Sequence, residues 1–319
     1  MEPQIQNKKK IYLKYLYYIY KFILIFFILF IFTLDYIHKK DNDNNLMNNI
    51  KVGLCAIGKK ENLYALEFVN HYEDLGYDHI FIYDNNNIND ERFEDVLRDK
   101  IDNNFVTIIN YRGFKACQLR AYDDCFRNNK RYYNWLSFFD FDELLILKKE
   151  NNIKNFLEDE KFKNCKNVKI NGLYFSDNDL IYYENKGVKE RFTTPLYNVS
   201  INQLIKSTVR SKGNLKNIWT FADNPHSPKC KNSCNSLGKY MGYKEFLNKP
   251  PDYEYAYFNH YNTKTIQEYI ERIKKGFADR DIIINNDYYK ERIEYFFNLN
   301  KKTKEKIDYI KKTLNISIE

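Results

Sequence analysis

Between residues 51 and 128, short apolar runs alternate with segments whose apolar residues recur at helical spacing, and this alternation constrains the fold more than any other feature. The apolar runs have the length of buried strands, and the segments between them have the length of helices. Strands that alternate with helices imply right-handed crossover connections and a mainly parallel sheet covered by helices. We therefore predict an α/β fold, with strands at 51–57, 79–83 and 105–109 and helices at 61–75, 90–101 and 114–128.

The next apolar run, WLSFFDFDELLIL at 135–147, carries three carboxylates, those of Asp140, Asp142 and Glu143. Alternate residues of a strand share a face, so Asp140 and Asp142 are expected to point the same way. Carboxylate oxygens suit Mg²⁺ or Mn²⁺, and such ions keep part of their coordination shell for substrate phosphates. The run therefore predicts a site for a metal ion and a nucleotide diphosphate. The structural alternative is a buried strand that ends in a solvated acidic turn.

Asp84 follows the second predicted strand and is expected on the same edge of the sheet, because ligands of such sheets bind beyond the carboxyl ends of the strands. One acid would then hold a nucleoside while the others hold the metal and the diphosphate. The alternative for Asp84 is an ordinary turn residue in the sequence DNNN. No Walker loop and no GxGxxG pattern competes for the nucleotide.

After the acidic run the pattern changes to shorter strands and loops, followed by three helical stretches. Strands are predicted at 168–175, 204–211 and 254–261, and they would extend the sheet of the first half into a mixed one. A hydrophobic content of 44% and an aromatic content of 17% are ample for one packed core. We therefore predict a single large domain over residues 50–319.

An apolar segment at 15–37 is long enough to span a bilayer as a helix. It lacks the short apolar core and small-residue cleavage site of a signal peptide, so we predict an uncleaved signal anchor. Four lysines precede it, which places the tail, 1–14, in the cytoplasm and the large domain in a lumen or outside the cell. The chain is thus expected to be a single-pass type II membrane protein, with a linker at 38–49. The sequons at Asn198 and Asn315 are compatible with that location.

The formal net charge of +8 does not indicate a nucleic-acid partner, because much of the excess lies at the two ends of the chain and no nucleic-acid motif accompanies it. The six cysteines would supply disulfides in a lumen, with a connectivity that the sequence leaves open. Cys230 and Cys234 have the spacing of half a zinc site, but no matching second pair follows.

Several motifs, in this order and spacing, resemble glycosyltransferase family 92 and related nucleotide-sugar transferases. The resemblance spans most of residues 51–276. It rests on GLCAIGKKENLYALEFVNHYEDLGYDHIFIYDNNN from residue 53, with its histidine-tyrosine step and its tyrosine-aspartate-asparagine loop, and on QLRAYDDCF at 118–126 and WLSFFDFDELL at 135–145. Later pieces are ERF at 190–192, Lys206-Ser207 with Arg210, His226, and NHYNTKTIQEY at 259–269.

The resemblance implies a GT-A fold and a metal-dependent transfer of a sugar, galactose as first guess, from a UDP-linked donor to a glycan or glycoconjugate hydroxyl. The metal would be Mn²⁺ or Mg²⁺. Residues 50–147 would form the nucleotide-sugar-binding half, residues 148–280 the acceptor half, and residues 281–319 C-terminal helices. The expected metal ligands are Asp140, Asp142 and His260, and the expected donor contacts are Asp84, Asp140, Glu143 and Lys264. In a eukaryote the domain would face the lumen of the Golgi or the endoplasmic reticulum.

The resemblance also suggests inversion at the anomeric centre, for which one carboxylate must take the proton of the acceptor hydroxyl. The candidates in the acceptor half are Asp177, Asp179, Glu190 and Asp223, and each has the alternative of being an ordinary surface acid. Family members often have tryptophan and phenylalanine-glycine after the central strand, whereas this chain has GLYFSDNDL at 172–180. That departure leaves the acceptor open.

Two other classes of protein remain. A phosphatase of the haloacid dehalogenase type also places an aspartate-x-aspartate after an apolar strand and uses one aspartate as nucleophile. It needs a small hydroxyl residue soon afterwards, where this chain has Leu144 and Leu145. The second class is a catalytically silent, membrane-anchored carbohydrate-binding relative, which measured donor hydrolysis or transfer would separate from an enzyme.

Overall fold

The computed structural model of this chain describes residues 20–22, 24–34, 50–211, 224–242, 245–277 and 280–317. The chain divides into two units, Met1–Ile50 and Lys51–Glu319. In the first unit the described residues 20–22 and 24–34 are helical and their side chains are exposed. Within the described ranges, no helix is both long enough and apolar enough to cross a membrane. The predicted span, 15–37, extends past these residues at both ends, and the predicted tail and linker lie outside the described residues.

The second unit is built on one mixed sheet. Its strands are β1 (Val52–Gly58), β2 (His79–Asp84), β3 (Val106–Asn110), β4 (Trp135–Phe138), β5 (Glu143–Leu147), β6 (Asn167–Tyr174), β7 (Ile205–Arg210), β8 (Ser233–Asn235), β9 (Tyr240–Met241) and β10 (Ala256–His260). Its helices are α2 (Asn62–Asp74), α3 (Glu94–Asp102), α4 (Gln118–Asn129), α5 (Ile153–Glu158), α6 (Val188–Arg191), α7 (Ile266–Lys275), α8 (Asn286–Leu299) and α9 (Lys304–Leu314), with short 3₁₀ turns at Glu160–Phe162 and Ser200–Gln203.

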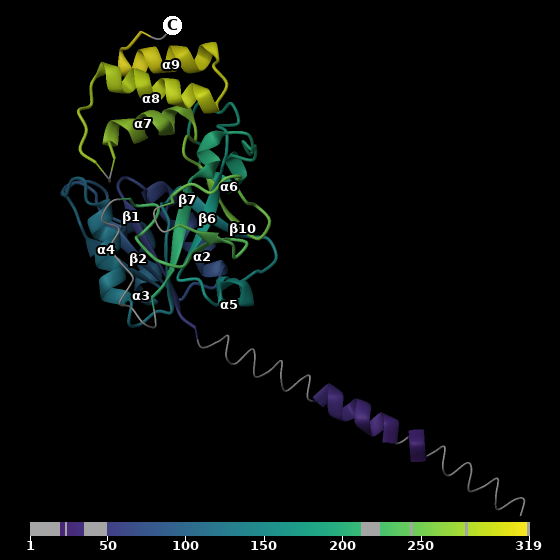
Figure 1. Ribbon diagram of the computed structural model, residues 1–319. Helices are drawn as coiled ribbons and strands as arrows, with labels where there is room; N and C mark the ends of the chain where they lie inside the picture. Colours follow the sequence, from purple (N-terminus) through teal and green to yellow (C-terminus); the bar gives the residue numbers. More distant parts are fainter. Residues whose placement is uncertain are drawn as a thin grey trace, which may run out of the picture. The chain divides into compact units, whose positions relative to one another are not determined.

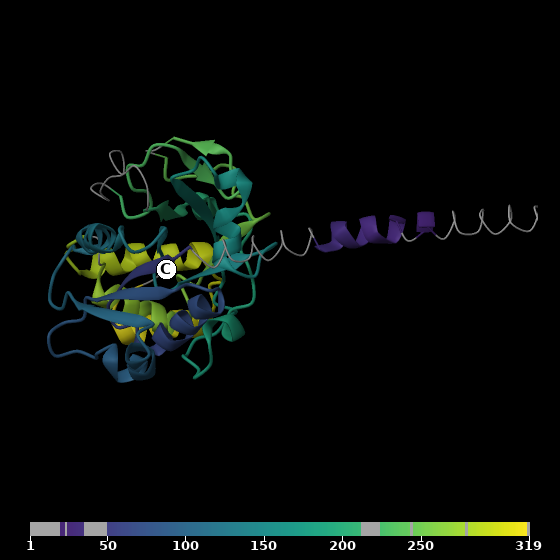
Figure 2. The ribbon, with the colours of Figure 1, turned by 90° about the horizontal axis from the view of Figure 1, so that it is seen from below.

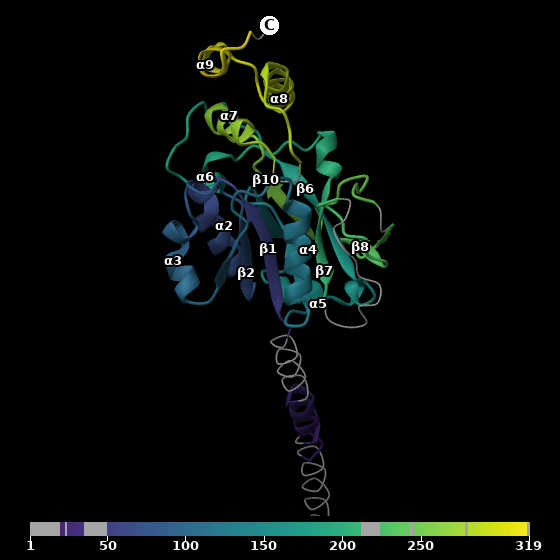
Figure 3. The same ribbon diagram turned by 90° about the vertical axis from the view of Figure 1, so that its left-hand side faces the viewer.

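The first half forms the parallel part of the sheet, in the order β3-β2-β1-β4. Strand β1 lies between β2 and β4 and is buried along its whole length, which explains why its sequence is a continuous apolar run rather than an alternating one. Helices α2 and α3 cover one face and α4 covers the other (Figure 3). This arrangement confirms the predicted alternation of strands and helices.

The second half extends the sheet in a mixed fashion. Strand β7 pairs antiparallel with β4, and β6 pairs antiparallel with β7. Strand β10 then runs parallel to β6, and β5 closes the series antiparallel to β10. The predicted strands at 168–175, 204–211 and 254–261 are confirmed as β6, β7 and β10. The predicted mixed α/β sheet flanked by helices is therefore present.

The three C-terminal helices form a layer of their own. Buried side chains that join them include Ile270 on α7, Phe296 on α8 and Ile310 on α9. Figure 1 shows this layer beyond one end of the strands, and the view from the opposite end in Figure 2 shows the same helices behind the sheet. Helix α7 begins in a capping box between Thr265 and Glu268, which fixes its start just after β10.

Two disulfides join elements of the second unit. Cys55 of β1 pairs with Cys125 of α4, and Cys165 pairs with Cys234 of β8. The bond between Cys234 and Cys165 rules out Cys230 and Cys234 as half of a zinc site, as the lack of a matching second pair in the sequence also indicates. Cys230 is buried and forms no disulfide.

Candidate active site

The three carboxylates of the acidic run lie on a tight turn between β4 and β5. The Asp140 carbonyl accepts the backbone N–H of Glu143 at 3.0 Å, and the Asp140 N–H donates to Glu143 Oε2 at 2.9 Å. The prediction that strand alternation places Asp140 and Asp142 on one face is thus wrong, because neither aspartate lies in a strand. The strand ends at Phe138, and the turn, rather than a pleat, brings the acids together.

Phe141, between the two aspartates, anchors this turn in the core. Its ring is buried and stacks on Phe93, with centroids 5.1 Å apart. A Cβ atom at Gly58, the last residue of β1, would lie only 2.6 Å from that ring. A glycine is therefore required where β1 ends for the turn to pack against it.

Helix α2 holds the backbone that follows the turn. Tyr72 donates its hydroxyl proton to the Glu143 carbonyl at 2.9 Å, and His71 Nε2 lies 2.8 Å from the Leu145 carbonyl. Since a carbonyl only accepts, His71 carries its proton on Nε2. The histidine-tyrosine step noted in the sequence is thus a support for the acidic turn.

Lys206, from β7, is fully buried between two of the acids. Its Nζ lies 2.6 Å from Asp140 Oδ2 and 3.1 Å from Glu143 Oε2. Burial alone would raise the pKa of Asp140, but the Lys206 ammonium outweighs it and holds that pKa below its usual value. For Glu143 burial prevails over Lys206, and its pKa is raised well above the usual value. The other oxygen of Asp140 accepts from Tyr122 at 2.7 Å and Gln118 at 3.0 Å.

Asp142 has different partners, both from the C-terminal half. Arg272 of α7 donates to Asp142 Oδ2, and His260 Nε2, at the end of β10, lies 3.5 Å from the same oxygen. Burial would raise the pKa of Asp142, but Arg272 and then His260 hold it well below its usual value. Burial also lowers the pKa of His260 despite Asp142. Nε2 of this ring also lies 3.3 Å from the Asn262 amide nitrogen.

The fit of these residues to a divalent cation depends on the distances between their ligand atoms. Two ligand atoms bound to one such ion at about 2.1 Å each lie about 3 Å apart, which is close to the separation of Asp142 Oδ2 and His260 Nε2. A carboxylate oxygen and an unprotonated imidazole nitrogen are suitable ligands for manganese. In the part of the chain that the structure describes, no group of three or more His, Cys, Asp or Glu side chains has the geometry of a metal centre. Asp142 and His260 thus fit as a partial site, while Asp140 already uses both oxygens within the protein.

The acidic turn opens into a cleft with a volume of about 350 Å³, which is within the usual range for small-molecule sites. Its wall is rich in cations, which outnumber its carboxylates. The cations are Lys59, Lys206, Arg272, Lys275, Arg280 and Arg292, and the carboxylates are Glu61, Asp140, Asp142 and Glu143. Such a wall suits a ligand with several negative charges that also reaches the acidic turn.

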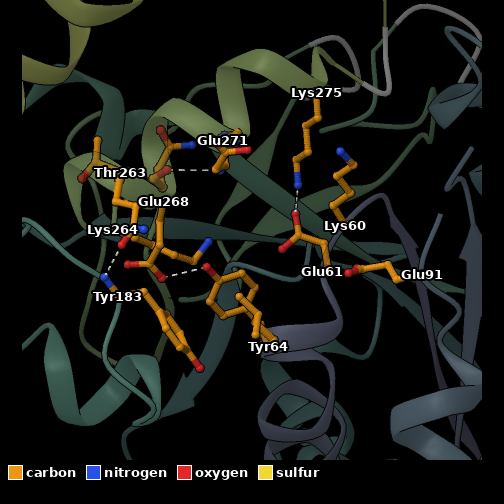
Figure 4. Close-up of a pocket in the computed structure, with 14 residues that line it drawn as sticks. Lys60, Glu61, Tyr64, Glu91, Tyr183, Thr263, Lys264, Glu268, Glu271 and Lys275 are labelled. Atoms are coloured by element: carbon orange, nitrogen blue, oxygen red, sulfur yellow. Dashed lines mark hydrogen bonds and ion pairs between the residues drawn. The ribbon is translucent and has the colours of Figure 1, made fainter. Parts of the chain in front are cut away.

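A second pocket of about 310 Å³ lies next to the cleft and shares Glu61, Asn262, Arg272 and Lys275 with it. Figure 4 shows the pair between Lys275 and Glu61 on one side of this pocket and Tyr64 bonded to Glu268 on the other. Lys264 is buried here with its ammonium 4.2 Å from the centre of the Tyr64 ring. Burial lowers the pKa of Lys264. The predicted donor contact Lys264 thus lines this neighbouring pocket, not the cleft of the acidic turn.

Asp84, the other predicted donor contact, ends β2 as expected but does not line either pocket. Its carboxylate is buried and accepts from Arg112 at 2.6 Å and from the Asn86 N–H at 2.9 Å. Arg112 also donates to four carbonyls of the loop after β2. Asp84 therefore organises that loop, and a contact to a nucleoside stays a prediction.

The predicted catalytic bases lie in several places. Asp177 is buried and pairs with Lys306 at 2.5 Å, which ties the loop after β6 to α9, and Asp179 pairs with the same ammonium at 3.1 Å. Burial raises the pKa of Asp177 despite this lysine. Glu190, on α6, is exposed near Lys186. Neither Asp177 nor Glu190 lines the cleft, and Asp223 lies outside the described residues.

Sequence reasoning missed the cations of the cleft. In the sequence Lys206 stands only in a short motif, and Arg272 and Lys275 belong to no motif. The one signal for the latter two is their spacing of three on a helix that starts soon after His260, which places both on one face. That spacing does not reveal which acids they meet, because Asp142 and Glu61 are far away in sequence.

The chain was compared with known proteins. The family model of glycosyltransferase family 92 matches residues 49–315. Among solved structures, this chain is similar to a crystal structure of S. aureus TarS 1–349 in complex with UDP-GlcNAc. The identity is 12%, the match covers 83% of this chain and 72% of that chain, and the TM-score is 0.37. The chain is also similar to S. aureus TarS 1–349 in complex with UDP, with 10% identity, 82% and 78% covered, and a TM-score of 0.37. No curated protein matches the chain. Because the family model covers most of the chain, including the acidic turn and His260, the chain belongs to glycosyltransferase family 92 and is a glycosyltransferase.

Proposed function

We propose that the chain transfers a sugar, galactose as the first candidate, from a UDP-linked donor to a hydroxyl of a glycan or glycoconjugate, within a GT-A fold. The observation that carries this proposal is the cleft at the carboxyl ends of the strands, where an acidic turn meets a wall of cations. A nucleoside diphosphate carries the matching charge, and its phosphates are natural co-ligands of a divalent cation.

In this proposal the diphosphate lies against the cations of α7 and the segment after it. Breaking the sugar-phosphate bond builds negative charge on UDP, and Arg272 and Lys275, which line the cleft, would offset that charge. Asp142 and His260 would hold Mn²⁺ or Mg²⁺, which when bound offsets the same charge without a proton transfer. Lys206 keeps Asp140 ionised, and Glu143 would contact the hydroxyls of the donor sugar.

We further propose that transfer inverts the anomeric centre, so that one base takes the proton of the acceptor hydroxyl. Of the carboxylates considered, Asp223 is the first to test. It stands two residues before Pro225 and three before His226 in the sequence, and both of these residues line the cleft. Asp177 and Glu190 are the matched alternatives.

We also propose that the catalytic unit faces a lumen behind an N-terminal anchor at 15–37, in the Golgi or the endoplasmic reticulum if the organism is eukaryotic. Two disulfides support this placement, since disulfides persist mainly in oxidising compartments.

The test is release of UDP by the full chain in detergent micelles, with a panel of UDP-sugars, a panel of glycan acceptors and added Mn²⁺. We expect turnover with one donor, and a loss of at least about 100-fold in kcat for Asp223→Asn with UDP binding unchanged. Glu160→Gln, a change from acid to amide at an exposed position, is the control. Absence of turnover with every donor, or full activity of Asp142→Asn, would contradict the proposed function.

A further inference from the structure

Arg272 pairs with the same oxygen of Asp142 that lies nearest to His260. It donates through Nη1 to Asp142 Oδ2, and the same nitrogen is 3.2 Å from the Asn262 carbonyl. Asp142 is almost fully buried, whereas the Arg272 side chain is 31% exposed toward the cleft. The acid is therefore fixed in place, and its partner has room to move.

The next basic residue of the same helix face repeats this arrangement. Lys275 pairs with Glu61, a partly buried acid just before α2 (Figure 4), and its Nζ also lies 2.6 Å from the Lys59 carbonyl. Glu61 Oε2 has no hydrogen-bond partner of its own. Helix α7 thus meets the first half of the domain through two pairs of a cation and a carboxylate, and all four side chains line the cleft.

A buried carboxylate does not serve an arginine and a divalent ion at the same oxygen. The two cations would repel each other at contact distance, and the lone pairs that face the cleft cannot accept both. A diphosphate in the cleft changes this balance, because it gives the guanidinium a bidentate partner with more charge than one carboxylate has.

We propose that Arg272 is an exchangeable partner of Asp142: its pair with Asp142 excludes the divalent cation, and its transfer to the diphosphate of the donor opens the site. The inference rests on the proposed function, since it needs a diphosphate ligand. Arg272 would thereby determine that the donor nucleotide binds before the divalent cation. The donor nucleotide and the cation then bind with positive coupling, and the cation alone binds weakly.

The test uses Mn²⁺ alone as the probe, with the full chain in detergent and the electron paramagnetic resonance signal of the free ion as the readout. We expect weak binding by the wild type and at least about tenfold tighter binding by Arg272→Gln, because Asp142 loses its competitor. Arg272→Lys keeps a cation within reach of Asp142 and should bind Mn²⁺ about as weakly as the wild type. Because Arg272→Lys also replaces this side chain, a gain in Mn²⁺ affinity that appears only in Arg272→Gln cannot come from the loss of the arginine packing alone.

Arg292→Gln is the matched control, since it removes one positive charge from the same cleft without touching Asp142. Adding Asp142→Asn to Arg272→Gln should abolish the gain. Equal affinity of the wild type and Arg272→Gln, or an equal gain in Arg292→Gln, would overturn the exchange. A separate UDP titration with Mn²⁺ distinguishes the two failures: if UDP does not bind the wild type, the proposed function fails, whereas if UDP binds and Mn²⁺ affinity ignores Arg272, only the exchange fails.

Discussion

At the scale of single residues, the site depends on charges that are buried together. The Lys206 side chain is fully buried, and its ammonium pairs with Asp140 and Glu143 of the acidic turn. Burial would lower the pKa of this lysine, but Asp140 and Glu143 raise it well above its usual value. The Lys206 ammonium therefore stabilises the folded turn.

Lys206→Met should lower the free energy of unfolding by about 3–5 kcal/mol, because it leaves the buried Glu143 and the partly buried Asp140 without their counter-charge. Urea unfolding followed by the fluorescence of Trp135, which is fully buried, measures this loss. Lys163→Met removes a cation of an exposed pair with Glu160 and should cost far less than Lys206→Met. Equal losses in the two variants would contradict the role of Lys206.

His71 makes stability depend on pH. Burial lowers its pKa to about 4, against about 6.5 in an unfolded chain. Between these values the unfolded chain binds more protons, so the free energy of unfolding should fall as pH decreases from 6.5 toward 4, by up to about 1.4 kcal/mol per pH unit.

His71→Gln keeps a donor for the Leu145 carbonyl but does not titrate. Unfolding curves at pH 7 and pH 5 should therefore show a smaller loss of stability for this variant than for the wild type. The same loss in both proteins would show that His71 does not carry the effect.

At the scale of elements, the sequence predicted most strands and helices, because apolar runs and helical spacing are local signals. It did not predict that the run at 135–147 divides, since β4 and β5 are equally apolar and only their different partners, β1 and β10, separate them. The ion pairs of Asp142 with Arg272 and of Asp177 with Lys306 could not be predicted from the sequence either. They join elements that are distant in sequence, and no local pattern records such contacts.

The disulfide between β1 and α4 should stabilise the second unit, since it closes a loop of 70 residues and so restricts the unfolded chain. Replacing both Cys55 and Cys125 by alanine should lower the free energy of unfolding by about 2–5 kcal/mol. Cys117→Ala, in the same apolar cluster but outside any disulfide, is the control and should cost clearly less. If all three replacements were equally mild, the disulfide would not contribute to the stability of the unit.

At the scale of the whole molecule, the site is assembled from both halves of the second unit. The turn after β4 supplies the acids, β7 supplies Lys206, and β10 with α7 supplies His260 and Arg272. The sequence could predict the acids and His260, which stand in recognisable motifs. It could not predict the cations around them, because a lysine or arginine on a helix face usually meets solvent.

The proposed orientation predicts glycans on the second unit. Asn198 and Asn315 are both exposed and stand in sequons, so a lumenal domain expressed in eukaryotic cells should carry up to two N-linked glycans. Endoglycosidase treatment should shift the full chain to the mobility of the double variant Asn198→Gln and Asn315→Gln. A membrane-bound, folded chain without glycans at either position would contradict a lumenal domain.

The most direct test of the account is a calorimetric titration of the full chain with UDP, with and without Mn²⁺, on the wild type and on Asp142→Asn. We predict that Mn²⁺ strengthens UDP binding to the wild type by at least about tenfold, and that this strengthening disappears in Asp142→Asn while Glu160→Gln behaves as the wild type. Well-folded protein that ignores UDP, or that binds it equally with and without Mn²⁺ in every variant, would contradict the site described around the acidic turn.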